Sequence, residues 1–348
     1  MTWTLSRRRF VMGTAAALAA PAVVTAARAQ SKTLYVNTYG GAWDIAHEAA
    51  FFKPFTDATG IEIKTVSPYS FAKLKAQVQS GSYEWDVTAT GAGQWLRAGN
   101  EGLAEPIDWN IVDKDKLYPG AVYVDTLKHS FISTNLVYRA DKFPNGGPKN
   151  WADFWDVEKF PGNRAMYSDA HSTLVFALLA DGVPIDKVYP IDFDRAYKKL
   201  DEIKRHIKVW WSQGSQSQQL LRDGEVDMMG MWNARASDLK NQGTPVEIVW
   251  DGAHMTNTMW GVAKGAPNAD IAWQFLQFAS QAEPQAEFAK RLYYGPANPD
   301  SYALIPDEIA RQLPSHPDNL ARLVQADVVW EAPNLMAMNE RFTQWLAS

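Results

Sequence analysis

The chain contains no cysteine among its 348 residues. Disulfide bonds, thiolate nucleophiles, iron–sulfur clusters and cysteine-based zinc sites are therefore excluded, and any metal site would have to use histidines and carboxylates. An excess of positive charge is also missing, because the net charge is −5 and the isoelectric point is near 5.7. Since no basic surface is present to attract phosphates, we predict no nucleic-acid partner.

The sequence motifs of common cofactor and hydrolase sites are missing as well. No G-x-x-x-x-G-K-[ST], H-E-x-x-H or G-x-S-x-G string occurs, and the six histidines show no i, i+4 spacing. Gly91-Ala92-Gly93 lacks the third glycine of a dinucleotide loop and is interpreted as a strand-to-helix turn. Asp169-Ala170-His171-Ser172 has the residue types of a hydrolase triad, but adjacent residues point in divergent directions. We therefore predict no catalytic site, no metal site and no cofactor.

The first 29 residues have the pattern of an export signal. Adjacent arginines in Ser6-Arg7-Arg8-Arg9-Phe10 precede an apolar run that reaches Val24 and is too short to span a bilayer. Ala27-Arg28-Ala29 supplies the small-x-small pattern of a cleavage site. The start is similar to the twin-arginine motif, with an ordinary secretion signal or a membrane anchor as the alternative. Cleavage after Ala29 would leave 30 basic and 39 acidic residues, an acidic periplasmic chain of net charge −9.

The remaining chain is rich in apolar residues, 46% over the whole sequence, which is enough for two folded lobes. Its first part alternates strand and helix patterns, and this predicts a mostly parallel sheet with helices on its faces. Gly60 is a natural cap for the end of the first helix. The predicted order is strand Thr33–Asn37, helix Ala42–Thr59, strand Ile61–Val66, helix Phe71–Val78 and strand Trp85–Thr90.

A second α/β unit follows, with strands and helices between Ala165 and Val249. The extended run Phe131–Tyr138 lies between the two units, and another, Asn257–Gly265, follows the second one. The chain is therefore expected to cross twice between two lobes and to leave a hinged cleft for a ligand. The second unit is predicted as strands Ala165–Tyr167, Ile207–Trp210, Val226–Met231 and Pro245–Val249, with helices Ser172–Ala180, Phe193–Lys204, Gln216–Asp223 and Ala234–Gln242.

Several short segments in this order carry a resemblance to a known family. They are Tyr35–Gly41, Phe51–Ile61, Tyr83–Val87, Val137-Tyr138 before Trp151–Trp155, and Met229–Asn233. The chain resembles the periplasmic solute-binding proteins of ABC importers, in the extracellular solute-binding family that contains spermidine/putrescine-type receptors. The resemblance implies a periplasmic binding protein-like fold of type II, in which two α/β lobes joined by a two-strand hinge enclose the ligand. The implied divisions are signal peptide 1–29, first lobe 30–134, second lobe 135–257, and 258–348, which returns to the first lobe and adds C-terminal helices near the hinge.

The same resemblance implies a set of ligand contacts in the cleft. In polyamine receptors of this family, carboxylates bind ammonium groups and aromatic rings pack on the methylene chain. Asp169 matches an acidic contact, whereas the next family acid is Ser172 here, which disfavours a long polyamine. Trp232 and Tyr294 match pocket aromatics. The remaining positions implied or considered are Tyr39 and Gly40 of the first loop, Gly93 of a second loop, Trp211 beside a polar turn, and Trp260, where the family has an acid.

Arg235 points to a different ligand from a polyamine. It lies three residues after Trp232 at a predicted helix start, where its guanidinium could bind a carboxylate through two hydrogen bonds; the alternative is a solvated arginine. The glycine turns near Gly40 and Gly93 would present amide groups to the same anion. We expect an ω-amino acid such as γ-aminobutyrate, with its ammonium group on Asp169 and its carboxylate on Arg235.

The function implied is that of a monomeric binding protein, not an enzyme, which delivers a small amine-bearing solute to an ABC permease and its ATPase at the inner membrane. A polyamine or a quaternary amine is an alternative ligand. Ferric ion is another, because Tyr293-Tyr294 could supply paired phenolates, although these rings fit core or cleft packing better. The competing class is an enzyme exported through the twin-arginine route.

Overall fold

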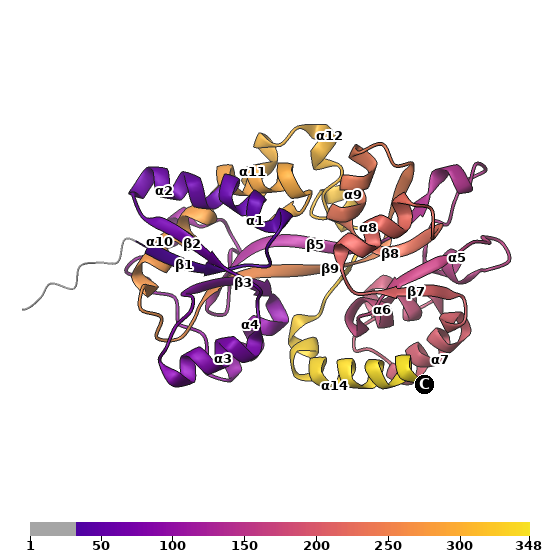
Figure 1. Ribbon diagram of the computed structural model, residues 1–348, viewed down its shortest axis with the longest axis horizontal. Coiled ribbons are helices and arrows are strands. Elements are labelled where there is room, and N and C mark those ends of the chain that lie inside the picture. The colour runs from indigo at the N-terminus through magenta and orange to yellow at the C-terminus, as the bar shows by residue number, and fades with distance from the viewer. Residues whose placement is uncertain (1–32) are drawn as a thin grey trace, which may run out of the picture. The chain divides into compact units, whose positions relative to one another are not determined.

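The computed structural model describes residues 33–348, and the predicted signal peptide 1–29 lies outside these described residues. The strands that they contain form one mixed sheet of 11 strands (Figure 1). Within residues 33–348, no helix is both long enough and apolar enough to cross a membrane. The main strands, in spatial order, are β2 (Glu62–Val66), β1 (Thr33–Asn37), β3 (Val87–Gly91), β9 (Val246–Val262), β5 (Thr126–Arg139), β8 (Met228–Trp232), β6 (Arg164–Tyr167) and β7 (Ile207–Trp211).

Two long strands connect the halves of this sheet. β5 and β9 pair with each other in antiparallel fashion over most of their length, while β9 also pairs with β3 and β5 with β8. On either side, β1 is parallel to β2 and β3, and β6 is parallel to β7 and β8. The predicted α/β units joined by two crossing strands are thus confirmed. The short strands β4 (Val122–Tyr123) and β10 (Gly295–Pro296) add to β5, and β11 (Val324–Gln325) adds to β9.

The second crossing differs from the prediction. The segments 245–249 and 257–265, expected as a strand and a separate crossing, fall largely within a single strand, β9 (Val246–Val262). Gly252 allows the strand to continue, because its φ of 72° favours glycine and a Cβ there would lie 3.0 Å from Leu179 and 3.2 Å from Trp151. The residues between the two predicted segments therefore continue the same strand.

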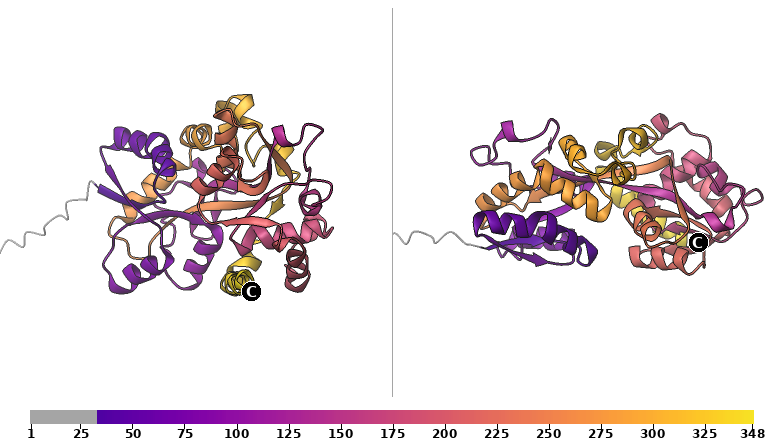
Figure 2. Two further views of the ribbon diagram at one scale, coloured as in Figure 1. Left: turned by 45° about the vertical axis from the view of Figure 1, so that its right-hand side comes forward. Right: turned by 90° about the horizontal axis from the view of Figure 1, so that it is seen from above.

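Helices cover both faces of the sheet around the first parallel group (Figure 2). The predicted helix 42–59 is continuous in space but contains a π-helical stretch, Glu48–Phe52, and it ends at Gly60 in the left-handed region, as expected. Phe51, Phe52 and Phe55 on this segment are buried in a core shared with the segment that returns from β9. The helices here are α1 (Ala42–His47), α2 (Lys53–Thr59), α3 (Phe71–Ser80), α4 (Ala92–Asn100), α10 (Ala269–Ala279) and α11 (Ala282–Leu292).

A second core lies around β6, β7 and β8. The last helix, α14 (Val328–Ala347), packs against both α4 and α6 (Figure 1). Its far end is fixed to α7, where Trp345 Nε1 donates to Asp201 at 2.8 Å and Arg341 pairs with Asp194 at 2.8 Å. The helices of this part are α5 (Trp151–Trp155), α6 (Ala170–Ala180), α7 (Phe193–Lys204), α8 (Gly214–Arg222) and α9 (Asn233–Asn241). The short helix α12 (Asp307–Ala310) packs with α11, and α13 (Pro317–Leu320) packs beside β9.

Two histidines face each other inside the first core. His47 Nε2 and His129 Nε2 are 2.8 Å apart, and both side chains are buried. His47 Nδ1 lies 2.8 Å from the Trp43 carbonyl, so Nδ1 carries the hydrogen and Nε2 accepts one from His129. His129 Nδ1 then accepts from Ser130 at 2.7 Å. Burial lowers the pKa of His47 to about 3 and, together with the neighbouring His47, lowers the pKa of His129 well below its usual value.

This pair is expected to make the protein less stable in mild acid. Below pH 6.5 the unfolded chain binds protons at His47 and His129 while the folded chain does not, so the free energy of unfolding falls as the pH falls. The loss approaches about 1.4 kcal/mol per pH unit for each imidazole. Urea unfolding between pH 7.5 and 5.5 measures it. The variant His129→Gln should show a smaller pH dependence than the wild type, with His206→Gln as the control; equal slopes for all three proteins would contradict the prediction.

Candidate functional site

Two cavities lie where elements of the two α/β groups face each other. The first, of about 170 Å³, is lined by Trp43 of α1, Arg235 of α9 and the segment 291–294. The second, of about 280 Å³, is lined by the start of α4, by Asp169 and His171 at the start of α6, and by Glu331 of α14. The two charged residues predicted to bind opposite ends of a ligand, Arg235 and Asp169, therefore line two separate cavities.

Aromatic residues of the first α/β group lie beside these cavities. Tyr39, in the loop after β1, is 48% exposed, and its hydroxyl donates to Thr90 Oγ1 at 3.1 Å. Its ring meets Trp43 edge-on at a centroid distance of 5.5 Å, and the ring of Tyr294 lies 5.9 Å from Trp43. Burial raises the pKa of Tyr294 to about 12, an effect that Arg235 opposes and Tyr39 reinforces. Tyr39 and Tyr294 thus belong to one group of rings near Arg235.

In the second α/β group, the rings of Tyr167, Trp211 and Trp232 pack on one another and form an aromatic wall. Trp211 is fully buried, stacks on Tyr167 at 4.4 Å, and donates from its indole nitrogen to the Gly230 carbonyl at 2.9 Å. Trp232 stands edge-on to both rings, at 5.4 Å from Trp211 and 5.3 Å from Tyr167. Burial and the charges of Asp169 and Tyr39 raise the pKa of Tyr167, which links this wall electrostatically to Tyr39 of the first group. The predicted aromatic residue Trp232 is thus held in one orientation.

Arg235 lies in the first turn of α9 with little of its hydrogen-bonding capacity used. Its Nη1 donates to Gln218 Oε1 at 3.2 Å, and Gln218 in turn donates to Asp238 at 2.6 Å. Within residues 33–348 no carboxylate lies within ion-pair distance of its guanidinium. Gly214, the first residue of α8, leaves room for this side chain, because a Cβ there would lie 2.9 Å from Arg235 Nε and 3.1 Å from Trp232. The arginine is therefore free to bind an anion.

Asp169 is the N-cap residue of α6. Its carboxylate accepts from the Ser172 amide at 3.2 Å, a contact that the first turn of a helix favours. Burial raises the pKa of this half-buried carboxyl, although His171 opposes the shift. No lysine or arginine of the described residues forms an ion pair with it. Asp169 thus offers to the second cavity a carboxylate that pairs with no lysine or arginine of residues 33–348, with His171 as its neighbouring ionisable group.

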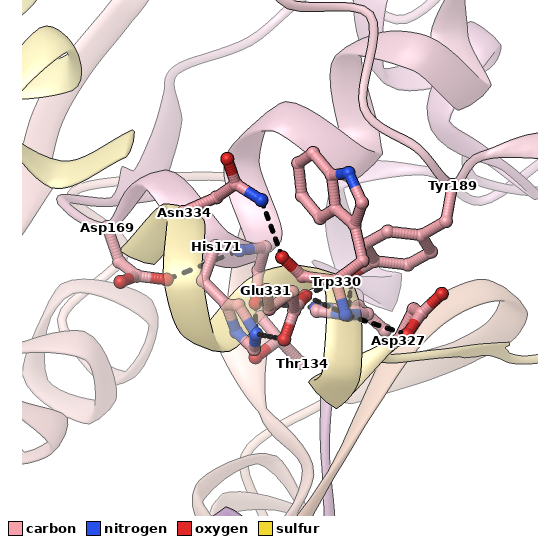
Figure 3. A network of polar contacts seen from close by, with 10 residues as sticks. Thr134, Asp169, His171, Tyr189, Asp327, Trp330, Glu331 and Asn334 are labelled. Atoms are coloured by element: carbon pink, nitrogen blue, oxygen red, sulfur yellow. Dashed lines mark hydrogen bonds and ion pairs between the residues drawn. The ribbon is translucent and has the colours of Figure 1, made fainter. Parts of the chain in front are cut away.

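A buried hydrogen-bond network continues from the same turn of α6 (Figure 3). Glu331 of α14 accepts from His171 Nε2 and from the Tyr189 hydroxyl. His254 of β9 lies with Nε2 at 3.1 Å from the Tyr189 hydroxyl and with Nδ1 at 3.2 Å from Ser172 Oγ. His171, His254 and Glu331 place their ligand-type atoms within 4.8 Å of one another. In this structure the atoms of the cluster hydrogen-bond to one another and to Tyr189 and Ser172.

The other predicted site residues lie in varied surroundings. The Gly40 amide donates to Asp44 at 2.9 Å and is not available to an anion, while Gly93 lines the second cavity. Ser172 is buried and its hydroxyl faces His254. Trp260 is 1% exposed and packs against His47 and His129 in the first core, so its size is needed there for packing.

Sequence reasoning missed the partners of His171. Glu331, Tyr189 and His254 are separated from it by 160, 18 and 83 positions, and only the fold brings them together. The motif Asp169-Ala170-His171-Ser172 contained the only local signal. Its prediction as a non-catalytic segment did not include a link to Glu331.

The chain is similar to proteins of one family. A model of the bacterial extracellular solute-binding proteins matches residues 50–315. The chain is 36% identical over 341 residues to the gamma-aminobutyric acid-binding protein of Pseudomonas aeruginosa, which covers 94% of each chain. It is 24% identical over 281 residues to the spermidine/putrescine-binding periplasmic protein of Escherichia coli, which covers 76% of this chain and 78% of the other.

Solved structures agree with this assignment. An ABC transporter substrate-binding protein from Bradyrhizobium japonicum superposes with a TM-score of 0.86 at 38% identity, over 90% of this chain and 99% of that one. A structure described as a GABA receptor gives a TM-score of 0.84 at 36% identity, over 90% and 97% of the two chains. The chain belongs to the bacterial extracellular solute-binding protein family, with the two-lobed, two-strand-hinge fold of periplasmic binding proteins. It is a solute-binding protein.

Proposed function

We propose that this protein is the substrate-binding component of an ABC importer for an ω-amino acid of the γ-aminobutyrate type. One observation carries the proposal most strongly. Arg235 and Asp169, both at helix starts beside the aromatic wall, have no ion-pair partner of opposite charge among residues 33–348. Because the two charges line separate cavities, one ligand binds both only if it bridges them, and a molecule with a carboxylate, an ammonium group and a methylene chain between them has the groups for this.

The surrounding contacts support the same ligand class. Arg235 acts on the pKa of Tyr294 and Asp169 acts on the pKa of Tyr167, so each of the two charges has an aromatic ring near it. Trp232 adds an aromatic face next to Arg235, since both approach Gly214. A relative named for γ-aminobutyric acid and a solved structure described as a GABA receptor point in the same direction.

The alternative ligands find less support. A polyamine has no group for Arg235. A ferric carrier would need the phenols of Tyr293 and Tyr294 on one ion. Both residues line the first cavity, but Tyr293 also packs with Tyr302 in one apolar cluster and Tyr294 with the first core. The competing catalytic function finds no known cofactor or hydrolase motif in the sequence.

The proposal extends to the cellular setting. The mature protein works as a monomer in the periplasm, reached through a twin-arginine-type signal in residues 1–29, and it hands its solute to a permease with an ATPase subunit. It needs no cofactor and no nucleic acid. These features rest on the sequence pattern and on the family.

Isothermal titration calorimetry of the ligand-stripped protein tests the ligand assignment. γ-Aminobutyrate should bind with one site per chain, and putrescine and spermidine should bind far more weakly, because neither satisfies Arg235. Butyrate and butylamine, which each keep only one charge, should also bind weakly. Tight polyamine binding together with no binding of γ-aminobutyrate would overturn the assignment.

A further inference from the structure

The amine end of the proposed site is built on the same helical turn as a second ionisable group. Asp169 and His171 are two positions apart at the start of α6, and both side chains line the second cavity. His171, 20% exposed, donates through Nε2 to Glu331 of α14, whose side chain is 5% exposed. Figure 3 shows Glu331 between His171 and Tyr189, with Asp169 at the edge of the group.

The carboxylates around His171 outnumber the cations near it unless a further cation binds. The ionisable groups that face His171 are Asp169 on its own helix, Glu331 on α14, His254 on β9, whose ring centroid lies 4.7 Å away, and Tyr189 through Glu331. Among the described residues no lysine or arginine pairs with Asp169 or Glu331. Two carboxylates therefore share one imidazolium at most.

His254 does not supply the missing charge. The Tyr189 hydroxyl donates to Glu331, so His254 Nε2 donates to Tyr189; in the neutral ring His254 Nδ1 then accepts from Ser172, whose hydroxyl also lies 3.4 Å from Thr134 Oγ1. His254 is fully buried in this neutral form, and burial followed by the charge of His171 lowers its pKa well below the usual value. The proton that can change with ligand binding is therefore on His171 or Asp169.

We infer that the Asp169–His171–Glu331 group exchanges a proton for the amine of the ligand, so that binding of an ammonium group at Asp169 releases a proton from this group to the solvent. The inference rests on the proposed function and adds a regulation of its amine site. His171 and Glu331 act here as positioning residues, which set the charge that the ligand meets without having to touch it.

The direction follows from the environment of each group. Burial raises the pKa of Asp169. Burial lowers the pKa of His171, but the hydrogen bond and charge of Glu331 and the charge of Asp169 outweigh this effect and raise it above 6.5. An ammonium group next to Asp169 favours the less protonated state of both residues. Affinity should therefore rise with pH between about 5.5 and 7.5, by up to tenfold per pH unit for each proton released, with the steepest rise where His171 titrates.

Calorimetry in paired buffers measures the proton directly. At pH 6.5, γ-aminobutyrate is titrated into the protein in phosphate and in imidazole buffer, which differ in their heat of protonation. A difference in observed heat that corresponds to release of up to one proton per ligand supports the inference. Equal heats in both buffers across pH 5.5 to 7.5 overturn it while leaving the proposed function intact. No binding heat with any amine overturns both.

Variants identify the group that carries the proton. His171→Gln should change both the number of protons released and the pH at which affinity rises, and Glu331→Gln should shift the rise to lower pH. His206→Gln, at a half-buried position after α7, is the matched control and should behave as the wild type. NMR of the imidazole CH groups gives an independent readout, because the His171 resonance should titrate at lower pH with ligand than without. An unchanged His171 titration would overturn the assignment even if a variant failed to fold.

Discussion

Replacing Arg235 by glutamine is expected to weaken binding of γ-aminobutyrate by about 100-fold or more. The guanidinium is the only described cation at the first cavity without a carboxylate partner, since Arg291, which also lines it, pairs with Glu287 at 2.6 Å. Loss of one member of a desolvated ion pair costs roughly 2–5 kcal/mol, because the other charge stays buried without its partner. Calorimetry or a fluorescence titration that uses the tryptophans beside the site measures the loss.

Two further variants make the Arg235 prediction specific. Arg235→Lys keeps the charge but not the two parallel N–H groups, so its affinity should fall between those of the wild type and Arg235→Gln. Arg291→Gln removes a neighbouring charge at the same cavity and should leave the affinity within a few-fold of the wild type. If Arg291→Gln lost as much affinity as Arg235→Gln, the effect would be one of net charge and the carboxylate would not be bound by Arg235.

Replacing Asp169 by asparagine should cause a loss of similar size through the other end of the ligand. Asparagine has nearly the same shape and can still accept from the Ser172 amide, so the start of α6 keeps its cap. The ammonium group loses its charged acceptor, and we expect about 100-fold weaker binding of γ-aminobutyrate. Butyrate, which lacks the amine, should bind equally weakly to the variant and to the wild type.

The matched control for Asp169 is another helix cap in the same half of the chain. Asp192 caps α7 by accepting from the Arg195 amide at 3.1 Å, and neither cavity includes it. Asp192→Asn should match Asp169→Asn in its small change of thermal stability but should bind γ-aminobutyrate normally. Normal binding by Asp169→Asn would show that the amine lies elsewhere.

Much of the fold was predictable because its signals are local. Alternating apolar residues at 33–37 and the helical spacing that ends at Gly60 depend only on neighbouring positions, and both were confirmed. The π-helical stretch at 48–52 and the continuity of β9 were not predictable. The first serves to bury several aromatic rings at once, and the second depends on the close approach of Trp151 and Leu179 to Gly252.

The candidate site was predictable where a single residue carries a charge at the start of a helix. Asp169 and Arg235 both lie at such positions, and the structure leaves both without an ion-pair partner within residues 33–348. Whether a tryptophan lies beside a cavity or inside a core was harder to predict, because its burial depends on segments that are distant in the sequence. Trp232 lies beside Arg235, whereas Trp260 is enclosed by His47, His129 and Phe275. Nothing in the sequence around Glu331 indicates that α14 reaches the amine end of the site.

The paired strands β5 and β9 determine how the two halves of the molecule can move. A single-stranded linker bends at any of its bonds, but a hydrogen-bonded ribbon resists bending and yields most easily by twisting about its own axis. This ribbon departs from regular strand geometry at two places. Its register shifts between Thr134 and Leu136, and Gly252 of β9 has a φ of 72°. If the strands twist only at these points, the two halves would rotate about one fixed axis. Opening and closing would then follow the same path and return the charged groups to the same positions each time.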